Sequence, residues 1–94
     1  MRLAGKSSTL PPYPGSPIKP GDRGVQVQQW VMVLKGCGES GFVTQGPGNA
    51  LYGPGKVRAT RRLHARLGLK QDGIVGPRTW AAGVAEVARR KRLR

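Results

Sequence analysis

The sequence predicts a mainly α fold: a compact three-helix domain with an extended Pro-rich N-terminal arm and a basic C-terminal tail. Three observations support this class. Apolar residues recur at helical spacing after residue 24, two Gly-Pro pairs precede helix-like segments, and the two ends differ in composition from the middle. Ninety-four residues suit one domain, so we divide the chain into an arm (1–20), a three-helix domain (21–86) and a tail (87–94) that continues the last helix.

The arm is rich in Pro, Gly and Ser, a composition that favours an extended polyproline-like conformation over a packed element. Tyr13 and Ile18 are its only large apolar side chains after Leu10. Two interpretations remain open: the arm is a flexible linker, or it lies on a neighbouring subunit. Its prolines are Pro11, Pro12, Pro14, Pro17 and Pro20.

The first helix is expected over about 25–34. Its apolar residues stand at i, i+3, i+4 and i+7, the spacing of one face of an amphipathic helix. They are Val27, Trp30, Val31 and Leu34. Asp22 is placed to cap the start of this helix, and Lys35-Gly36 is a common helix end.

One local pattern then occurs twice: a turn, two apolar residues, Gly-Pro and a helix. In the clearer copy, Asp72-Gly73 predicts a tight turn with positive φ at the glycine, and Pro77 sets φ for the first helical turn. The weaker copy stands twenty-three residues earlier, with Asn49 in place of the aspartate. The apolar and Gly-Pro pairs are Leu51-Tyr52 with Gly53-Pro54, and Ile74-Val75 with Gly76-Pro77. Such a repeat is typical of stacked supersecondary units.

The second helix is expected over about 56–67, with Gly68 ending it and Leu69 returning to the core. Its inward face would be Val57, Thr60, Leu63, His64 and Leu67. The third helix follows the second Gly-Pro pair, and its apolar stripe would be Trp80, Val84, Val87 and Ala88. It continues into the basic run 89–94.

These motifs, in this order, resemble the peptidoglycan-binding-like domain, a small three-helix module appended to bacterial and phage cell-wall hydrolases. The resemblance covers about 21–84 and is strongest in its last part. The matching residues are Gly21, Gly24, Val27, Asn49, Tyr52, Gly53, Pro54, Gly68, Leu69, Asp72, Gly73, Val75, Gly76, Pro77, Thr79 and Trp80. The chain departs from the family pattern at Asn49-Ala50, Lys56, Leu63-His64 and Trp30-Val31, so the fold is carried over better than the ligand.

The resemblance implies a ligand groove between helices. Tyr52 and Trp80 are candidate contacts for sugar faces, and Arg78 for carboxylates. Core packing is the alternative for both tryptophans. The remaining motif residues would serve the fold: Gly53, Pro54, Asp72, Gly73, Gly76, Pro77 and Thr79.

The net charge is +13, with seventeen basic residues against four acidic ones, which indicates an anionic partner. Nucleic acid, a teichoic-acid-bearing wall, anionic lipid and an acidic protein all remain open. Candidate polyanion contacts are Arg58, Arg61, Arg62, Arg66, Arg89, Arg90, Lys91, Arg92 and Arg94. The helix arginines have a second interpretation, a solvated helix face. The run 89–94 points more strongly to a polyanion because five of its six residues are basic.

No catalytic constellation is apparent. Cys37 is the only cysteine and His64 the only histidine, so a disulfide within the chain and a common zinc ligand set are excluded. Two of the four carboxylates have expected roles in a turn and a cap. The segment after Gly53 lacks the first Gly and the Ser or Thr of a phosphate-binding loop. We therefore expect a protein that is not an enzyme and has no metal or cofactor.

Met1–Leu10 has no apolar h-region, and the longest run of large apolar residues is Trp30–Leu34, so we expect neither a signal peptide nor membrane insertion. The product would be made in the cytoplasm and then carried in a virion or released by lysis. The leading hypothesis is a non-catalytic module that binds peptidoglycan or another cell-wall polymer. The alternatives are a bacteriophage capsid or tail accessory protein, whose arm and tail contact virion proteins or packaged DNA, and nucleic-acid binding as the main role.

Overall fold

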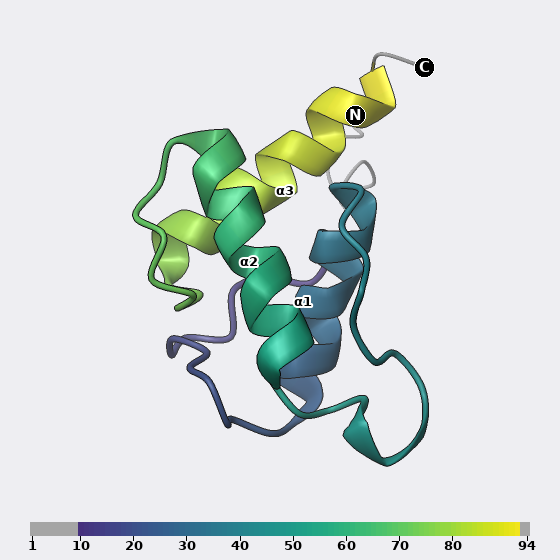
Figure 1. Cartoon of the computed structure of the whole chain (residues 1–94). Helices are drawn as coiled ribbons and strands as arrows, with labels where there is room; N and C mark the ends of the chain where they lie inside the picture. The colour runs from purple at the N-terminus through teal and green to yellow at the C-terminus, as the bar shows by residue number, and fades with distance from the viewer. Residues whose placement is uncertain (1–9, 93–94) are drawn as a thin grey trace.

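The computed structural model describes residues 10–92, and this part of the chain contains three α-helices joined by irregular segments (Figure 1). They are α1 (Val25–Gly36), α2 (Pro54–Leu67) and α3 (Pro77–Arg92), with a short 3₁₀ helix η2 (Gly46–Gly48) in the loop after α1. The predicted mainly α class with three helices is confirmed. Each helix contacts the other two, so they enclose one core.

Two tryptophans occupy the centre of this core. Trp30 of α1 is fully buried, and its ring centroid lies 5.5 Å from that of Trp80 in α3. The indole Nε1 of Trp30 donates a hydrogen bond of 2.9 Å to Thr60 Oγ1, which in turn donates to the Lys56 backbone carbonyl. The polar edge of the buried indole is therefore satisfied within α2, as such groups require.

Helices α1 and α3 approach closely because each has a glycine at the contact. A Cβ placed on Gly83 would lie 2.8 Å from Val33 Cγ1 and 3.1 Å from the Trp30 ring. On the other helix, a Cβ at Gly36 would lie 2.8 Å from Val87 Cγ2. Any larger side chain at either position would push the two helices apart, so the two glycines set the distance between α1 and α3.

The repeated pattern seen in the sequence is also a repeat in structure. Tyr52 and Val75 occupy equivalent positions, and both are buried in short extended segments that bond to the chain before α1. Val75 exchanges two backbone hydrogen bonds of 3.0 Å with Ile18, while Tyr52 N–H donates to the Asp22 carbonyl at 2.8 Å. One residue later comes the glycine that precedes each helix, followed by Pro54 or Pro77 as the first helical residue.

The second copy has the predicted turn. Gly73 adopts a φ of 75°, and the Asp72 carboxylate accepts a hydrogen bond of 3.0 Å from the Ile74 N–H. The end of α2 is also as predicted: Gly68 has a left-handed φ of 73°, and Leu69 N–H donates to the His64 carbonyl. Both glycines occupy conformations that other residues adopt only at a cost.

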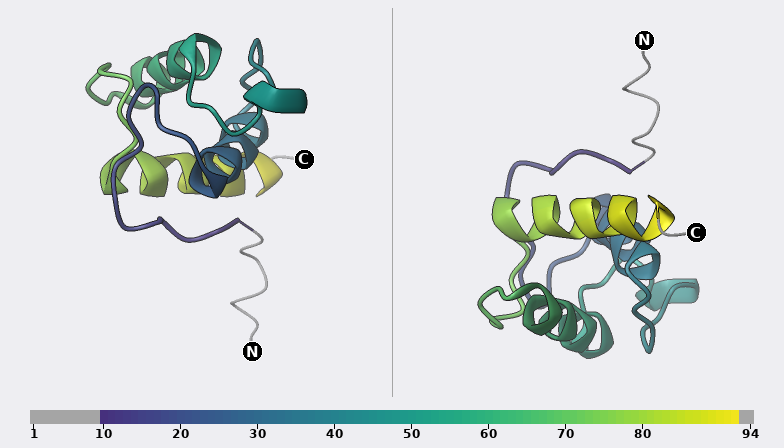
Figure 2. Two further views of the ribbon diagram at one scale, coloured as in Figure 1. Left: turned by 90° about the horizontal axis from the view of Figure 1, so that it is seen from below. Right: turned by 90° about the horizontal axis from the view of Figure 1, so that it is seen from above.

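The described part of the arm, residues 10–20, packs on its own domain. Figure 2 shows its first part passing along the side of α3 that faces away from α2 and the chain then turning around the start of α3. Ile18 is 1% exposed, Trp80 Nε1 donates to the Pro11 carbonyl at 3.1 Å, and Tyr13 meets the Trp80 ring edge-on at 5.9 Å. The flexible-linker interpretation is therefore wrong for this segment, because its few apolar residues fill the core of the same chain. Contact of its exposed side with a neighbouring subunit stays a prediction. Residues 1–9 lie outside the described part.

Several local expectations are also corrected. Asp22 does not cap α1, because its carboxylate accepts from the Lys19 N–H and the residue before the helix is Gly24. Helix α1 does end at Lys35-Gly36 as expected, and the positive φ that follows is taken by Gly38. Ala88 is exposed rather than part of the apolar stripe of α3.

Candidate polyanion interface

The predicted sugar-binding residues do not form an open groove. Tyr52 is fully buried, its hydroxyl donates to the Gly73 carbonyl, and burial raises its pKa to about 12. Trp80 is 3% exposed and lies between Trp30 and the N-terminal segment. Both rings are core residues, so the aromatic contacts expected from the resemblance are wrong. Arg78 alone of the three is exposed.

The predicted polyanion contacts separate into paired and unpaired arginines. Glu39, in the turn after α1, is buried and forms ion pairs with both Arg62 and Arg66 of α2. Within residues 10–92, Arg58 and Arg61 form no ion pair with a carboxylate. Burial explains the pairing, since a carboxylate removed from water is stable only with cationic partners.

A second glutamate continues this network on α3. Both oxygens of Glu86 accept hydrogen bonds of 2.9 Å from Arg89, and Arg66 and Arg90 lie 3.6 and 3.7 Å from Oε2. The hydrogen bonds from Arg89 lower the pKa of Glu86, and the same contact raises the pKa of Arg89. This arginine–glutamate network joins α2, α3 and the turn after α1. Sequence reasoning missed it, although the i, i+3 spacing of Glu86 and Arg89 was a usable signal.

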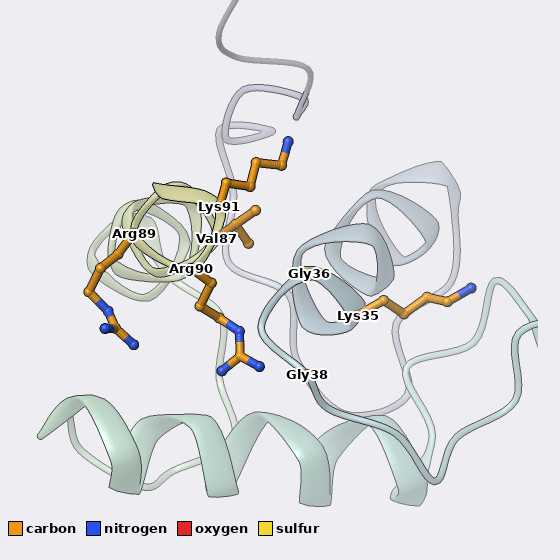
Figure 3. A pocket seen from close by; sticks show the side chains of 7 residues that line it. All are labelled: Lys35, Gly36, Gly38, Val87, Arg89, Arg90 and Lys91. Carbon is orange, nitrogen blue, oxygen red and sulfur yellow. The ribbon is translucent and has the colours of Figure 1, made fainter. Parts of the chain in front are cut away.

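Cations gather where α1 and α3 end. A hollow of about 600 Å³, the basic hollow, is bounded by the last turns of these helices (Figure 3). Its lining residues are Lys35, Gly36, Gly38, Val87, Arg89, Arg90 and Lys91. None of them is a carboxylate.

The side chains of the basic hollow extend in different directions. Figure 3 shows Arg89 and Arg90 directed toward α2 and Lys91 directed away from it. Arg90 lies over the turn at Gly38, where an added Cβ would be 2.8 Å from its Nη2. A ligand in the hollow would contact several cationic side chains and the apolar side chain of Val87, which is 6% exposed.

The sequence found only part of this surface. The sequence predicts Arg89, Arg90 and Lys91 as polyanion contacts, but it indicates only a helix end at Lys35. It joins the others because α1 and α3 end side by side, which no local pattern reveals. Arg92 is exposed at the end of α3, and Arg94 lies outside the described residues.

Two buried polar side chains serve the fold instead. Lys56 Nζ donates to the backbone carbonyls of Gly48, Asn49 and Leu51 at 2.7–3.1 Å, and burial lowers its pKa. His64 is fully buried; its Nε2 is hydrogen-bonded to Thr79 Oγ1 at 3.0 Å. In the described structure its Nδ1 has no partner, and burial lowers its pKa, so the ring is neutral near pH 7.

The chemistry available at the surface is therefore anion binding by guanidinium and ammonium groups. In the part of the chain that the structure describes, no group of three His, Cys, Asp or Glu side chains is arranged to hold a metal ion. None of the helices in residues 10–92 has the length and apolar character that a membrane span requires. A scan against family models and searches of curated proteins and of solved structures found no match to this chain.

Proposed function

We propose that this protein is a non-catalytic binding module for an anionic polymer of the bacterial cell wall, and that the polymer binds at the basic hollow. The observation that carries the proposal is the gathering of Lys35, Arg90 and Lys91 around one hollow; Glu86, which lies 3.7 Å from Arg90, is not among its lining residues. The resemblance to peptidoglycan-binding-like domains over 21–84 supports the choice of a wall polymer.

The buried aromatic rings decide how such a polymer would be held. Since Tyr52 and Trp80 cannot stack on sugars, binding relies on charge, through phosphodiesters of teichoic acid or carboxylates of peptidoglycan. The cationic groups are exposed, so added salt screens their attraction. Retention on the wall should therefore weaken steadily with ionic strength.

The test is co-sedimentation of the full chain with sacculi that retain teichoic acid and with sacculi stripped of it, at low and high salt. The variant Lys35→Gln/Arg90→Gln/Lys91→Gln removes three charges from the basic hollow. At about 0.5 kcal/mol per exposed contact, it should weaken binding about tenfold. Circular dichroism checks that the variant folds.

The matched control is Arg58→Gln/Arg61→Gln/Lys70→Gln, which removes the same net charge from exposed positions elsewhere. It should keep most of the retention. Equal losses in the two variants would mean that net charge alone brings the protein to the wall, and the proposed site would be wrong. No retention at low salt would refute wall binding altogether.

The virion alternative predicts a different preference. Under this alternative, the phosphates of packaged DNA would bind at the same basic hollow. Residues 10–20 pack on the core of their own chain, so the test addresses the contact with DNA. Duplex DNA is therefore added to the sacculi at constant ionic strength. Displacement of the protein by DNA at phosphate concentrations far below those of the wall polymer would favour the virion role.

A further inference from the structure

A second surface, separate from the basic hollow, lies over the start of α2. Two hollows of about 540 and 440 Å³ adjoin there, one toward the loop 41–48 and the other toward Pro20 and Val57. They share four lining residues, Leu51, Gly53, Pro54 and Arg58, so they lie side by side on the surface. We refer to the two hollows together as the α2 groove.

The surface of the α2 groove is largely apolar. Val43 is 53% exposed and is one of three exposed large apolar side chains in residues 10–92. Phe42 and Leu51 are half-buried in the same hollow, Val57 is half-buried in the second hollow, and Pro54 is exposed between the two. Hollows lined mostly by apolar side chains on a highly charged domain are candidate binding sites.

Two arginines without carboxylate partners border this apolar surface. Arg58 lines both hollows and Arg61 lines the second, one helical turn further along α2. The nearby cation Lys56 is already bonded to three carbonyls, and the Asp72 carboxylate accepts from the backbone of its own turn. The groove thus combines apolar surface with two arginines that form no ion pair with a carboxylate of residues 10–92.

The contrast with the rest of the surface is informative. Arg62, Arg66, Arg89 and Arg90 each lie within 4 Å of Glu39 or Glu86. Arg58 and Arg61 stand on the same helix as the first two of these, but next to apolar side chains. A partner that supplies both carboxylates and apolar groups would complement them.

We propose that the α2 groove binds an extended segment of a partner protein in which acidic and apolar side chains alternate. Side chains of such a segment alternate in direction, so apolar residues enter the hollows while acidic ones reach Arg58 and Arg61. These arginines are neighbours on one helix face at i, i+3, a spacing that suits two acidic residues two positions apart. A uniformly charged polymer has no side chains for the apolar surface, which is why a peptide is favoured over DNA or teichoic acid.

The test uses a fluorescein-labelled peptide with three Leu-Asp pairs flanked by Gly and Ser, titrated into the ¹⁵N-labelled full chain. Amide shifts should change around Leu51 and Val57 and stay constant around Val87. Peptides with Asn for Asp, or Ser for Leu, should each bind about tenfold more weakly, because one of the two types of contact is lost.

Variants of the chain locate the site. Arg58→Gln/Arg61→Gln should weaken peptide binding about tenfold, and Val43→Glu should do the same by placing a charge on the exposed apolar surface. The matched control Lys35→Gln/Lys91→Gln should bind the peptide like the unaltered chain. Folding is monitored from the rest of the ¹⁵N spectrum.

Shift changes centred on the basic hollow, or binding that survives Arg58→Gln/Arg61→Gln, would overturn the proposal. Displacement of the peptide by a purified muropeptide at similar concentration would replace the protein partner with a wall peptide. The Arg58→Gln/Arg61→Gln variant should keep most of its retention on sacculi. If the peptide does not bind at the α2 groove, the proposal for the basic hollow is unaffected. If the protein is not retained on sacculi, the proposal for the α2 groove is likewise unaffected.

Discussion

Replacing Gly83 by alanine should destabilise the protein, although alanine is the better helix former. Gly83 lies within α3, where helix propensity alone favours alanine by about 0.5–1 kcal/mol. The added methyl group, however, would stand 2.8 Å from Val33 Cγ1 and 3.1 Å from Trp30 Cη2, and both of these side chains are fully buried. Neither can move without displacing other core residues.

The magnitude follows from these opposing effects. Inserting a methyl group into a well-packed core costs about 1–3 kcal/mol, which exceeds the gain in helix propensity. We expect a net loss of about 1–2 kcal/mol in the free energy of unfolding. For a domain of this size the melting temperature should fall by roughly 5–10 °C.

Urea unfolding followed by tryptophan fluorescence measures the effect, since both tryptophans are in the core. Ala85→Gly is the control, an exposed site on the same helix that should lose about 1 kcal/mol from propensity alone. Combining Gly83→Ala with Val33→Ala removes the nearest contact, so the double variant should be at least about 1 kcal/mol more stable than additivity predicts. A Gly83→Ala protein as stable as the parent, or strictly additive effects, would refute the steric argument.

Three further outcomes are expected from buried polar groups. Lys56→Met leaves three backbone carbonyls without their ammonium donor and should lower the free energy of unfolding by about 2–3 kcal/mol in urea; a loss below about 0.5 kcal/mol would contradict that role. Because burial lowers the pKa of His64, the unfolded chain binds its proton first, and stability should fall as the pH drops below 6.5, by at most about 1.4 kcal/mol per pH unit. His64→Gln should flatten this dependence between pH 5 and 7, and an unchanged slope would assign it to other groups. Burial raises the pKa of Cys37 to about 11, so its thiol should react with a disulfide reagent at pH 8 only as fast as the protein opens; immediate labelling of the folded protein would contradict its burial.

The sequence was sufficient for the local elements. Apolar spacing predicted α1, the two Gly-Pro pairs predicted where α2 and α3 begin to within two residues, and Gly68 and Gly73 take the predicted left-handed conformations. These features depend on steric and hydrogen-bonding preferences within a few residues of the chain, so they can be read without knowing the neighbours.

Only the tertiary structure decided which residues face solvent and which charges remain free. Trp80 looked like a ligand contact, yet it is enclosed because α1 and the segment 10–20 cover it from two sides. Arg62 and Arg58 look alike in the sequence, but only Arg62 meets Glu39, which folds back from the turn after α1. Burial and ion pairing depend on which segments that are distant in sequence come into contact. Local sequence determines the helices, but it does not determine these tertiary contacts.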